Sequence, residues 1–326
     1  MQTSVHGEDV VTIVSLNLER DGGENTPDGR FPKRWLDAHH EILKPLHADV
    51  ILRQEATCSD LEDERRLKAA GELLGMPGFL SPNNIGRNPT ALFVRPQTFP
   101  VFERVKYNTM FWRTPPTIVS ARLADVPEAE LLLMSWHNAF NSPRGREREA
   151  DEVTAFVDRM ERRGGFIGGG DCNEEPLPDG ESVTPIPWAT VTDHRHLVHR
   201  TNLAPDGSRV SCRYVDRTLL TCGLHDAARH AAHTLGQPDA IGPTAGHAKP
   251  DQGGPRRIDR IYVDGRIARA ILSVDVVDTT GVSDHHGLRL VLSRRGLGEA
   301  LRREHQPLPP IQAVAIPLPG RYEARA

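Results

Sequence analysis

The sequence predicts a mixed α/β fold, and three observations indicate it. Residues 10–19 and 48–55 hold apolar, β-branched runs, which is the composition of buried strands. Residues 35–46 and 146–160 instead repeat apolar side chains at helical spacing. The chain has 326 residues, of which 38% are hydrophobic and 26% charged, so it is long enough for one large core or two small ones. The pattern alone predicts no more than a mixture of strands and helices.

The first part of the chain is expected to alternate strands with helices. Both expected strands, 10–19 and 48–55, end in polar or acidic side chains. The helix at 35–46 follows the first strand. A second amphipathic helix is expected at 61–74, where Gly75 supplies a C-terminal cap.

The rest of the chain is expected to be richer in strands. Short β-type runs lie between Pro, Asn and Asp breaks, and they cover residues 90–95, 100–106, 117–123, 131–136, 257–263, 270–277 and 287–292. Residues 177–255 are rich in Pro, Gly, His and Arg, and one helix is expected there at 224–235. Long polar insertions of this kind often carry specificity.

We expect one catalytic domain over residues 1–296 and a Pro-rich tail, extended or disordered, over 297–326. No apolar run is long enough to span a membrane, and the first strand begins too early for a signal peptide. The four cysteines form no CxxC pair, which favours a reducing cytoplasm, with a Cys212–Cys222 bridge as an open alternative. We therefore expect a cytoplasmic protein, and a monomer.

The net charge of the chain limits the kind of partner it binds. The formal charge is −4 and the pI is about 6.4. This is not the charge of a protein that coats nucleic acid electrostatically. It leaves room for an enzyme that meets nucleic acid along one basic rim.

The most informative stretch is Gly-Gly-Gly-Asp-Cys-Asn at residues 168–173. Side chains alternate along a strand, so Asp171 and Asn173 emerge on one side if the chain stays extended. The glycines allow a sharp turn and the close approach of another group. A carboxylate beside an amide suits a hard cation, a water or a phosphate, and an Asx-type turn is the structural alternative.

Polar side chains also end most of the other expected strands. The full set is Asn17, Glu19, Glu55, His137, Asn138, Asp171, Asn173, Asp259, Ser283, Asp284 and His285. Strand ends gathered at one edge of a sheet form a natural site. Carboxylate and amide oxygens without thiolates favour Mg²⁺, Mn²⁺ or Ca²⁺ over Zn²⁺. The chemistry that fits is phosphoester hydrolysis, with a carboxylate that activates water and an imidazole that donates to the phosphate.

At this point the chain resembles a known family. The segments Ser-Leu-Asn-Leu-Glu, Leu-Arg-Gln-Glu, Ser-Trp-His-Asn, Gly-Gly-Asp-Cys-Asn, Arg-Ile-Asp-Arg-Ile and Ser-Asp-His occur in the order of the endonuclease/exonuclease/phosphatase superfamily, which includes DNase I-like nucleases. The resemblance covers roughly residues 10–295. It implies a four-layer αββα sandwich of two mixed β-sheets flanked by helices, and a metal-dependent phosphoester hydrolase.

The resemblance also implies roles for the residues that would hold a metal and activate water. Glu55 would be the principal metal ligand, beside Asn17 and Glu19, although the family often has Asp where Glu19 stands. Asp171 would orient or deprotonate the attacking water. Asn173 would hold that water or the phosphate.

Two histidines and two further acids complete the implied site. His285 would contact a phosphate oxygen, while Asp259 fixes its tautomer and raises its pKa. Asp284 would be a further metal or water ligand. His137 matches a histidine that DNase I-like members place near the leaving group or phosphate; abasic-site enzymes lack it, which argues against that subfamily.

Several side chains have a structural alternative. Asn138 and Arg144 are candidates for substrate binding, but Arg144 also suits the solvated first turn of a helix. His286 is the alternative to His285 as the inward imidazole. The remaining candidates are expected to be structural: a solvated loop for His194, His196 and His199, and packing for Trp112 and Trp188.

Three functions follow as hypotheses. The first is a Mg²⁺-dependent phosphodiesterase, most simply a nuclease that uses in-line water attack. The second is a phosphatase or phosphodiesterase acting on a small molecule or a lipid headgroup, which the acidic pI favours. The third is a protein that binds phosphate ligands without turnover, against which the intact set of acids and histidines argues.

Overall fold

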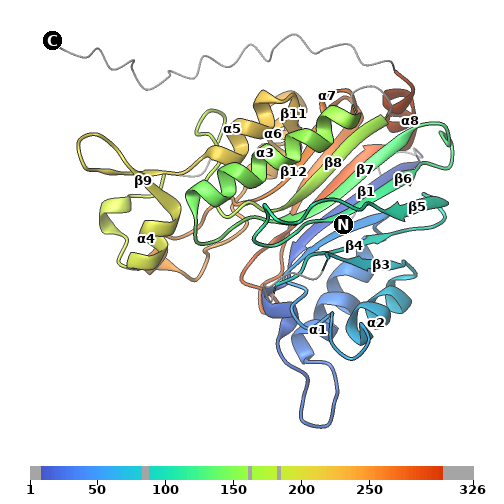
Figure 1. Cartoon of the computed structure of the whole chain (residues 1–326), viewed down its shortest axis with the longest axis horizontal. Helices are drawn as coiled ribbons and strands as arrows, with labels where there is room; N and C mark the ends of the chain where they lie inside the picture. Colours follow the sequence, from blue (N-terminus) through green and yellow to red (C-terminus); the bar gives the residue numbers. More distant parts are fainter. Residues whose placement is uncertain (1–8, 83–87, 161–163, 182–184, 304–326) are drawn as a thin grey trace.

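The computed structural model describes residues 9–82, 88–160, 164–181 and 185–303. Two six-stranded sheets pack face to face and carry helices on their outer faces (Figure 1). The predicted four-layer sandwich is therefore confirmed. Within the described ranges, every helix is too short or too polar to span a bilayer. The four cysteines are all unbridged, including Cys212 and Cys222.

Each sheet mixes parallel and antiparallel neighbours. The first consists, in spatial order, of β13 (Ile271–Val277), β14 (Gly287–Ser293), β1 (Val10–Asn17), β2 (Val50–Gln54), β4 (Ala91–Val94) and β3 (Gly78–Leu80). The second consists of β11 (Leu224–Asp226), β12 (Asp259–Asp264), β8 (Gly164–Asp171), β7 (Glu130–His137), β6 (Thr117–Arg122) and β5 (Val101–Arg104). A separate hairpin pairs β9 (Thr201–Leu203) with β10 (Arg209–Ser211).

The helices are short apart from one. They are α1 (Lys33–Asp37), α2 (Arg65–Leu74), α3 (Pro143–Met160), α4 (His194–Arg200), α5 (Tyr214–Thr221), α6 (Ala227–Thr234), α7 (Gly265–Ala268) and α8 (Arg294–Arg302). Single turns of other helix types occupy Glu19–Gly22, Ala38–Leu43, Lys44–Leu46, Trp188–Thr190, Pro238–Ile241 and Pro250–Gln252.

Strand alternation divides the apolar residues among three layers. Val11 and Ile13 of β1 point into a core shared with Leu133 of β7, between the two sheets. Their neighbours on β1, Val14 and Leu16, face outward and pack against α1 and α2. In the same way, alternate residues of β7 pack against α3 and α5. β1 and β7 therefore read as continuous apolar runs, because both of their faces are covered.

Two predicted helix boundaries differ from the structure. The helix expected at 61–74 begins at Arg65, because Glu62 and Glu64 have left-handed backbone angles (φ 50° and 59°). The helix expected at 224–235 begins at Ala227, because residues 224–226 pair with β12 and the Asp226 carboxylate caps the helix.

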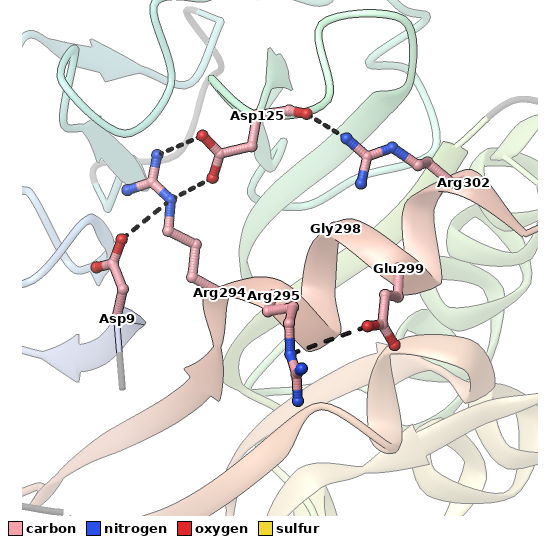
Figure 2. Close-up of a pocket in the computed structure, with 7 residues that line it drawn as sticks. All are labelled: Asp9, Asp125, Arg294, Arg295, Gly298, Glu299 and Arg302. Atoms are coloured by element: carbon pink, nitrogen blue, oxygen red, sulfur yellow. Dashed lines mark hydrogen bonds and ion pairs between the residues drawn. The ribbon is translucent and has the colours of Figure 1, made fainter. Parts of the chain in front are cut away.

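The boundary predicted at residue 296 falls inside α8. Ser293 caps this helix, and its residues Leu297 and Leu301 are buried in the core between the sheets. Figure 2 shows a surface pocket beside α8, where the Arg294 guanidinium pairs with Asp125 at 2.6 Å and with Asp9 at 3.5 Å. The packed helix extends the domain through Arg302; the rest of the predicted tail, residues 304–326, lies outside the described residues.

The glycines of β8 allow close packing around this strand near the site. A Cβ on Gly168 would lie 2.4 Å from the Trp136 ring, and one on Gly170 (φ 148°) would lie 1.9 Å from the Trp136 carbonyl oxygen. Close by, the Gln54 amide donates to the Ser135 hydroxyl at 3.1 Å, which links β2 to β7. Only glycine fits this part of β8.

A buried network of ion pairs ties residues 177–255 to the second sheet. Arg257 pairs with Asp226 at 2.7 Å and with Glu181 at 2.5 Å. Arg229 of α6 pairs with the same Glu181 at 3.0 Å and with Asp216 of α5 at 2.8 Å. The insertion is therefore fixed to the catalytic fold by charge pairs as well as by apolar packing.

Gly170→Ala should destabilise the fold strongly, because the added Cβ meets a backbone carbonyl and the φ angle is unfavourable for alanine. We expect a loss of about 3 kcal/mol or more in the free energy of unfolding, measured in denaturant. Gly29→Ala is the matched control: its φ is 78° with nothing within 4 Å of the new Cβ, so only about 1 kcal/mol should be lost. Equal losses would show that close packing at Gly170 is unimportant.

Asp226→Asn should change how stability depends on pH. Burial would raise the pKa of Asp226, but Arg257 and Arg229 outweigh burial and hold the pKa below its ordinary value. The carboxylate then stabilises fully above the unfolded pKa of about 3.9, and this contribution is lost as pH falls through the folded pKa. We expect Asp226→Asn to cost about 3 kcal/mol at pH 7, and the gap to the parent protein to narrow below about pH 4.

The measurement is a denaturant unfolding series from pH 7 to pH 3. Asp179→Asn, at an exposed position of the same insertion, is the control and should leave the pH profile unchanged. A gap between Asp226→Asn and the parent protein that stays constant with pH would contradict the ion-pair account.

Candidate active site

The candidate site lies where strands of the two sheets end. β1 and β2 run parallel, so Asn17 at the end of β1 and Glu55 directly after β2 lie at the same edge of the first sheet. β7 and β8 also run parallel and place His137 beside Asp171. β12 is antiparallel to β8, so it begins at this edge, with Asp259 opposite Asp171. The topology therefore brings together residues that are far apart in the sequence.

Asp171 is the centre of the site, and it is only 2% exposed. One carboxylate oxygen, Oδ2, accepts the Asn17 side-chain N–H at 3.2 Å. The same oxygen lies 3.5 Å from His137 Nε2 and 3.9 Å from His285 Nε2. Burial would raise the pKa of Asp171, but the nearby histidines and Arg200 outweigh it and lower the pKa. Asp171 is therefore ionised near neutral pH.

The chain turns directly after Asp171 instead of staying extended. β8 ends at Asp171, and Asn173 has a left-handed backbone angle (φ 55°). The backbone N–H of Asn173 donates to Asp171 Oδ1 at 2.7 Å, which is the Asx-type turn. The Asn173 side-chain amide then donates to the Asn138 carbonyl at 2.8 Å. Asp171 and Asn173 are held together by this turn, so of the two alternatives the structure shows the Asx-type turn.

His285 faces the site and forms a short pair with an acid. Its Nδ1 donates to Asp259 Oδ2 at 2.8 Å, which leaves Nε2 directed toward Asp171. Burial would lower the pKa of His285, but the bond to Asp259 and the nearby carboxylates outweigh burial and raise it to about 10. His286 lies against Thr279 and His247 instead, with ring centroids of the two imidazoles 4.2 Å apart. His285 is therefore a cationic donor inside the site.

Asn17 and Glu55 offer oxygen atoms beside Asp171. The Asn17 amide N–H reaches Glu55 Oε1 at 3.4 Å, and Glu55 Oε2 accepts the Arg20 backbone N–H at 2.9 Å. Asn17 Oδ1 is buried with no hydrogen-bond partner. A buried amide oxygen without a donor, next to a carboxylate, fits a hard divalent cation.

A second group also has the spacing of metal ligands. One ligand atom each from Asp171, Asp259 and His285 lie within 4.8 Å of one another. His285 and Asp259, however, are already bonded to each other at 2.8 Å, and this bond occupies His285 Nδ1 and one carboxylate oxygen of Asp259. Asn17 and Glu55 are free of such a mutual ion pair, so they are the better ligand set.

The sequence matches the model of the Endonuclease/Exonuclease/phosphatase family over residues 14–285. The chain belongs to this family. The family comprises divalent-metal-dependent nucleases and phosphatases, so the prediction of a hydrolytic enzyme is confirmed. No curated protein matches the sequence.

Solved structures of nucleases and phosphatases share the fold. The 3′ phosphatase NExo from Neisseria, bound to a product DNA hairpin, is 18% identical, with a TM-score of 0.57 and coverage of 86% of this chain and 98% of that chain. The AP endonuclease from Archaeoglobus fulgidus is 17% identical, with a TM-score of 0.56 and coverage of 86% and 99%. The AP endonuclease LMAP from Leishmania major is 14% identical, with a TM-score of 0.60 and coverage of 87% and 88%. At these identities the likeness supports the fold alone.

Glu19 and Asp284 lie differently from the rest of the predicted metal set. β1 ends at Asn17, and Glu19 belongs to the helical turn that follows, so the two do not share a strand face. The Glu19 carboxylate pairs with Arg34 at 2.8 Å and is 40% exposed. Asp284 is exposed beside His285. Asn17, which is buried, and Glu55, which is half-buried, are therefore the metal-ligand candidates that lie in the site.

The two predicted substrate-binding residues also differ in position. Asn138 is buried, and its amide donates to Glu149 of α3 at 3.3 Å. Arg144 is exposed on the first turn of α3, as the structural alternative held. Arg146, two residues along, is fully buried and pairs with Glu174 at 3.1 Å. Asn138 is thus a scaffold for the Asn173 turn in this structure.

Sequence reasoning missed Arg200, the residue that holds Asn173 from the insertion. Its guanidinium donates to both the carbonyl and the side-chain oxygen of Asn173. Arg200 ends α4, a helix capped by the Asp193 carboxylate, which accepts the His196 backbone N–H at 3.0 Å. His196 is buried on this helix, so the expectation of a solvated loop over 194–199 was wrong. Asp193, an N-cap residue before a helix-compatible run, was the available signal.

Both candidate stacking residues are packed. Trp112 and Trp188 are each 7% exposed. Trp188 belongs to a small cluster with Ile186 and Val191 that supports α4. Packing, the expected role, is what the structure shows for both side chains.

Proposed function

We propose that this family member is a Mg²⁺-dependent phosphodiesterase that hydrolyses nucleic acid by direct attack of water. The observation that carries the proposal is the placement of an ionised Asp171 between the Asn17–Glu55 oxygens and the His285–Asp259 pair. An acid, a cationic donor and a candidate cation site gathered around one carboxylate suit in-line attack on a phosphate.

Each side chain then has a defined task. Asp171 accepts the proton of the attacking water, for which its ionised state is required. Protonated His285 donates from Nε2 to a phosphate oxygen, and Asp259 keeps the imidazole in that tautomer. His137 lies beside the same Asp171 oxygen and serves the phosphate or the leaving group. Asn173, held by its turn, orients the water or the phosphate.

Asn17 and Glu55 would hold the cation, with Glu19 and Asp284 as outlying candidates. Mg²⁺, or Mn²⁺ or Ca²⁺ in its place, neutralises phosphate charge and stabilises the leaving oxygen when bound. The chain's own contribution is to hold the buried Asn17 amide beside the half-buried Glu55 carboxylate, through the 3.4 Å contact of Asn17 Nδ2 with Glu55 Oε1, and to leave Asn17 Oδ1 free of a hydrogen-bond donor.

A phosphatase acting on a small phosphoester is the second candidate, and the acidic net charge of −4 favours it. A chain of net negative charge repels a polyanionic substrate unless its basic side chains cluster where that substrate binds. A nuclease should therefore bind DNA or RNA in a salt-sensitive way, whereas a small-molecule phosphatase should instead release inorganic phosphate from nucleotides or sugar phosphates.

Glu55→Gln should weaken Mn²⁺ binding by about tenfold or more, because a charged oxygen ligand is lost. Isothermal titration calorimetry measures the affinity. Glu62→Gln, an exposed partner of Arg65, is the control and should bind like the parent protein. Asp259→Asn should also retain binding. If Asp259→Asn loses Mn²⁺ while Glu55→Gln keeps it, the cation lies in the Asp171–Asp259–His285 group instead.

Asp171→Asn and His285→Ala should each slow hydrolysis by about 10²- to 10⁴-fold, because each removes a proton-transfer or charge-stabilising group. Supercoiled plasmid DNA and a labelled RNA are the substrates, with Mg²⁺, with Mn²⁺ and with EDTA. His286→Ala should cleave at the parent rate, since this imidazole packs against His247. Absence of cleavage of both polymers by the parent protein would favour the small-phosphoester alternative.

A further inference from the structure

Arg200, in the insertion, and Arg256, directly after it, lie beside the site without forming an ion pair, although the Glu175 carboxylate is close enough for its charge to act on both. Arg200 donates to the backbone and side-chain oxygens of Asn173. Arg256 is 5% exposed and donates to His196 Nε2 at 3.0 Å and to the carbonyl and side-chain oxygens of Gln252, each at 2.9 Å. Among the residues that the structure describes, neither guanidinium forms an ion pair with a carboxylate, in contrast to Arg146, Arg229 and Arg257 nearby.

A buried cation that lacks a carboxylate is costly, so its presence calls for a reason. Burial lowers the pKa of Arg200 to about 10, and burial likewise lowers the pKa of Arg256. The fold adds supporting structure to keep both in place: Asp193 caps α4, and Trp188 packs near His196 with ring centroids 6.0 Å apart. The Nε–H of Arg256 is buried with no acceptor. The less buried Arg200 guanidinium can donate further hydrogen bonds to an anion, whereas Arg256 offers mainly its positive charge.

The two arginines belong to the site's surroundings and not to its reacting centre. Arg200 bonds to Asn173, which lies between it and Asp171 in the chain of contacts. Arg256 has no hydrogen bond to an acid, and the charges of Glu175, Asp171 and Asp284 offset only part of the lowering of its pKa by burial. In Figure 1, α4 and the β9 hairpin form a lobe beside the two sheets, and Arg200 is the last residue of that helix.

We propose that Arg200 and Arg256 form a subsite for a phosphate that neighbours the scissile phosphate on a nucleic-acid strand. This rests on the proposed function, since it names the substrate as a polyanionic strand. A guanidinium offers several N–H donors to phosphate oxygens, and Arg200 supplies the more exposed of the two forks. Arg256, almost fully buried, contributes chiefly its charge. The subsite explains how a chain of net charge −4 holds an anionic strand: the insertion gathers cations locally.

The test is the affinity for a fluorescently labelled single-stranded oligonucleotide, measured by anisotropy at several salt concentrations with Mg²⁺. All proteins carry Asp171→Asn, so that the strand is not cleaved. Adding Arg200→Gln or Arg256→Gln should raise Kd by about tenfold and reduce the slope of log affinity against log salt by about 0.7. Arg195→Gln is the matched control, because Arg195 is exposed on the same helix, and it should change neither quantity.

A second measurement separates this inference from the proposed function. Bis(4-nitrophenyl) phosphate carries one phosphate, so its hydrolysis by proteins with an intact Asp171 reports the reacting centre alone. Arg256→Gln should keep kcat/KM for it within about threefold, a split expected for a contact remote from the reacting group. Unchanged oligonucleotide affinity and salt slope in both glutamine variants would overturn the subsite and leave the phosphodiesterase intact.

Two other outcomes are equally decisive. Equal losses on the oligonucleotide and on bis(4-nitrophenyl) phosphate, in both glutamine variants, would move the guanidiniums to the scissile phosphate and overturn the subsite. Failure of the parent protein to hydrolyse bis(4-nitrophenyl) phosphate with any divalent cation, while it binds the strand through both arginines, would overturn the proposed function alone. Circular dichroism and thermal unfolding confirm that each variant is folded.

Discussion

The close approach of the two sheets at Gly170 is the constraint on which the site depends. A side chain there would meet the Trp136 carbonyl at 1.9 Å and the Gln54 amide at 2.9 Å. Because the glycine removes that obstacle, β8 lies near both β7 and β2, and the Gln54–Ser135 bond joins the sheets at this level. The same approach brings Asn17 of one sheet within 3.2 Å of Asp171 in the other. A wider gap would leave two separate half-sites.

Carboxylates crowded at such an edge repel one another unless positive charge lies among them. In this site the positive charge has two different sources. Asp259 and Asp171 face one another across antiparallel strands, and His285 lies between them as a cation whose pKa is raised to about 10. The site thus holds its own positive charge on the Asp259 side. On the side of Asn17 and Glu55, no side-chain cation takes that place in the contacts of these two residues. This asymmetry is what a metal ion on one side and an imidazolium on the other would require.

The strand ends could be predicted from the sequence because their information is local. An apolar run followed by a polar pair places Asp171 and Glu55 at strand ends whatever the rest of the chain does. Which of two nearby polar residues faces inward depends on the turn that follows, and this depends on longer-range contacts. Glu19 was misplaced for that reason, since the chain turns after Asn17 and Arg34 binds its carboxylate. Within 177–255, polar residues are buried as partners of one another, so hydropathy gives no signal of burial.

In the insertion, the main effect of the buried ion pairs is to fix the orientation of its helices, more than to add to the stability of the fold. Apolar side chains would fill the same volume at a lower desolvation cost, yet they would not fix the angle of a helix to the sheet. Arg257 bonds two acids at once, and the pairs continue through Arg229, so the elements of the insertion are held in one orientation. The end of α4 is held by a separate contact, in which the Arg146 guanidinium donates to the His199 carbonyl at 2.8 Å. Arg200 must reach Asn173 from there, and a guanidinium placed one turn away would point its charge elsewhere. The polar composition that makes the segment hard to interpret is therefore what allows it to present cations at the site.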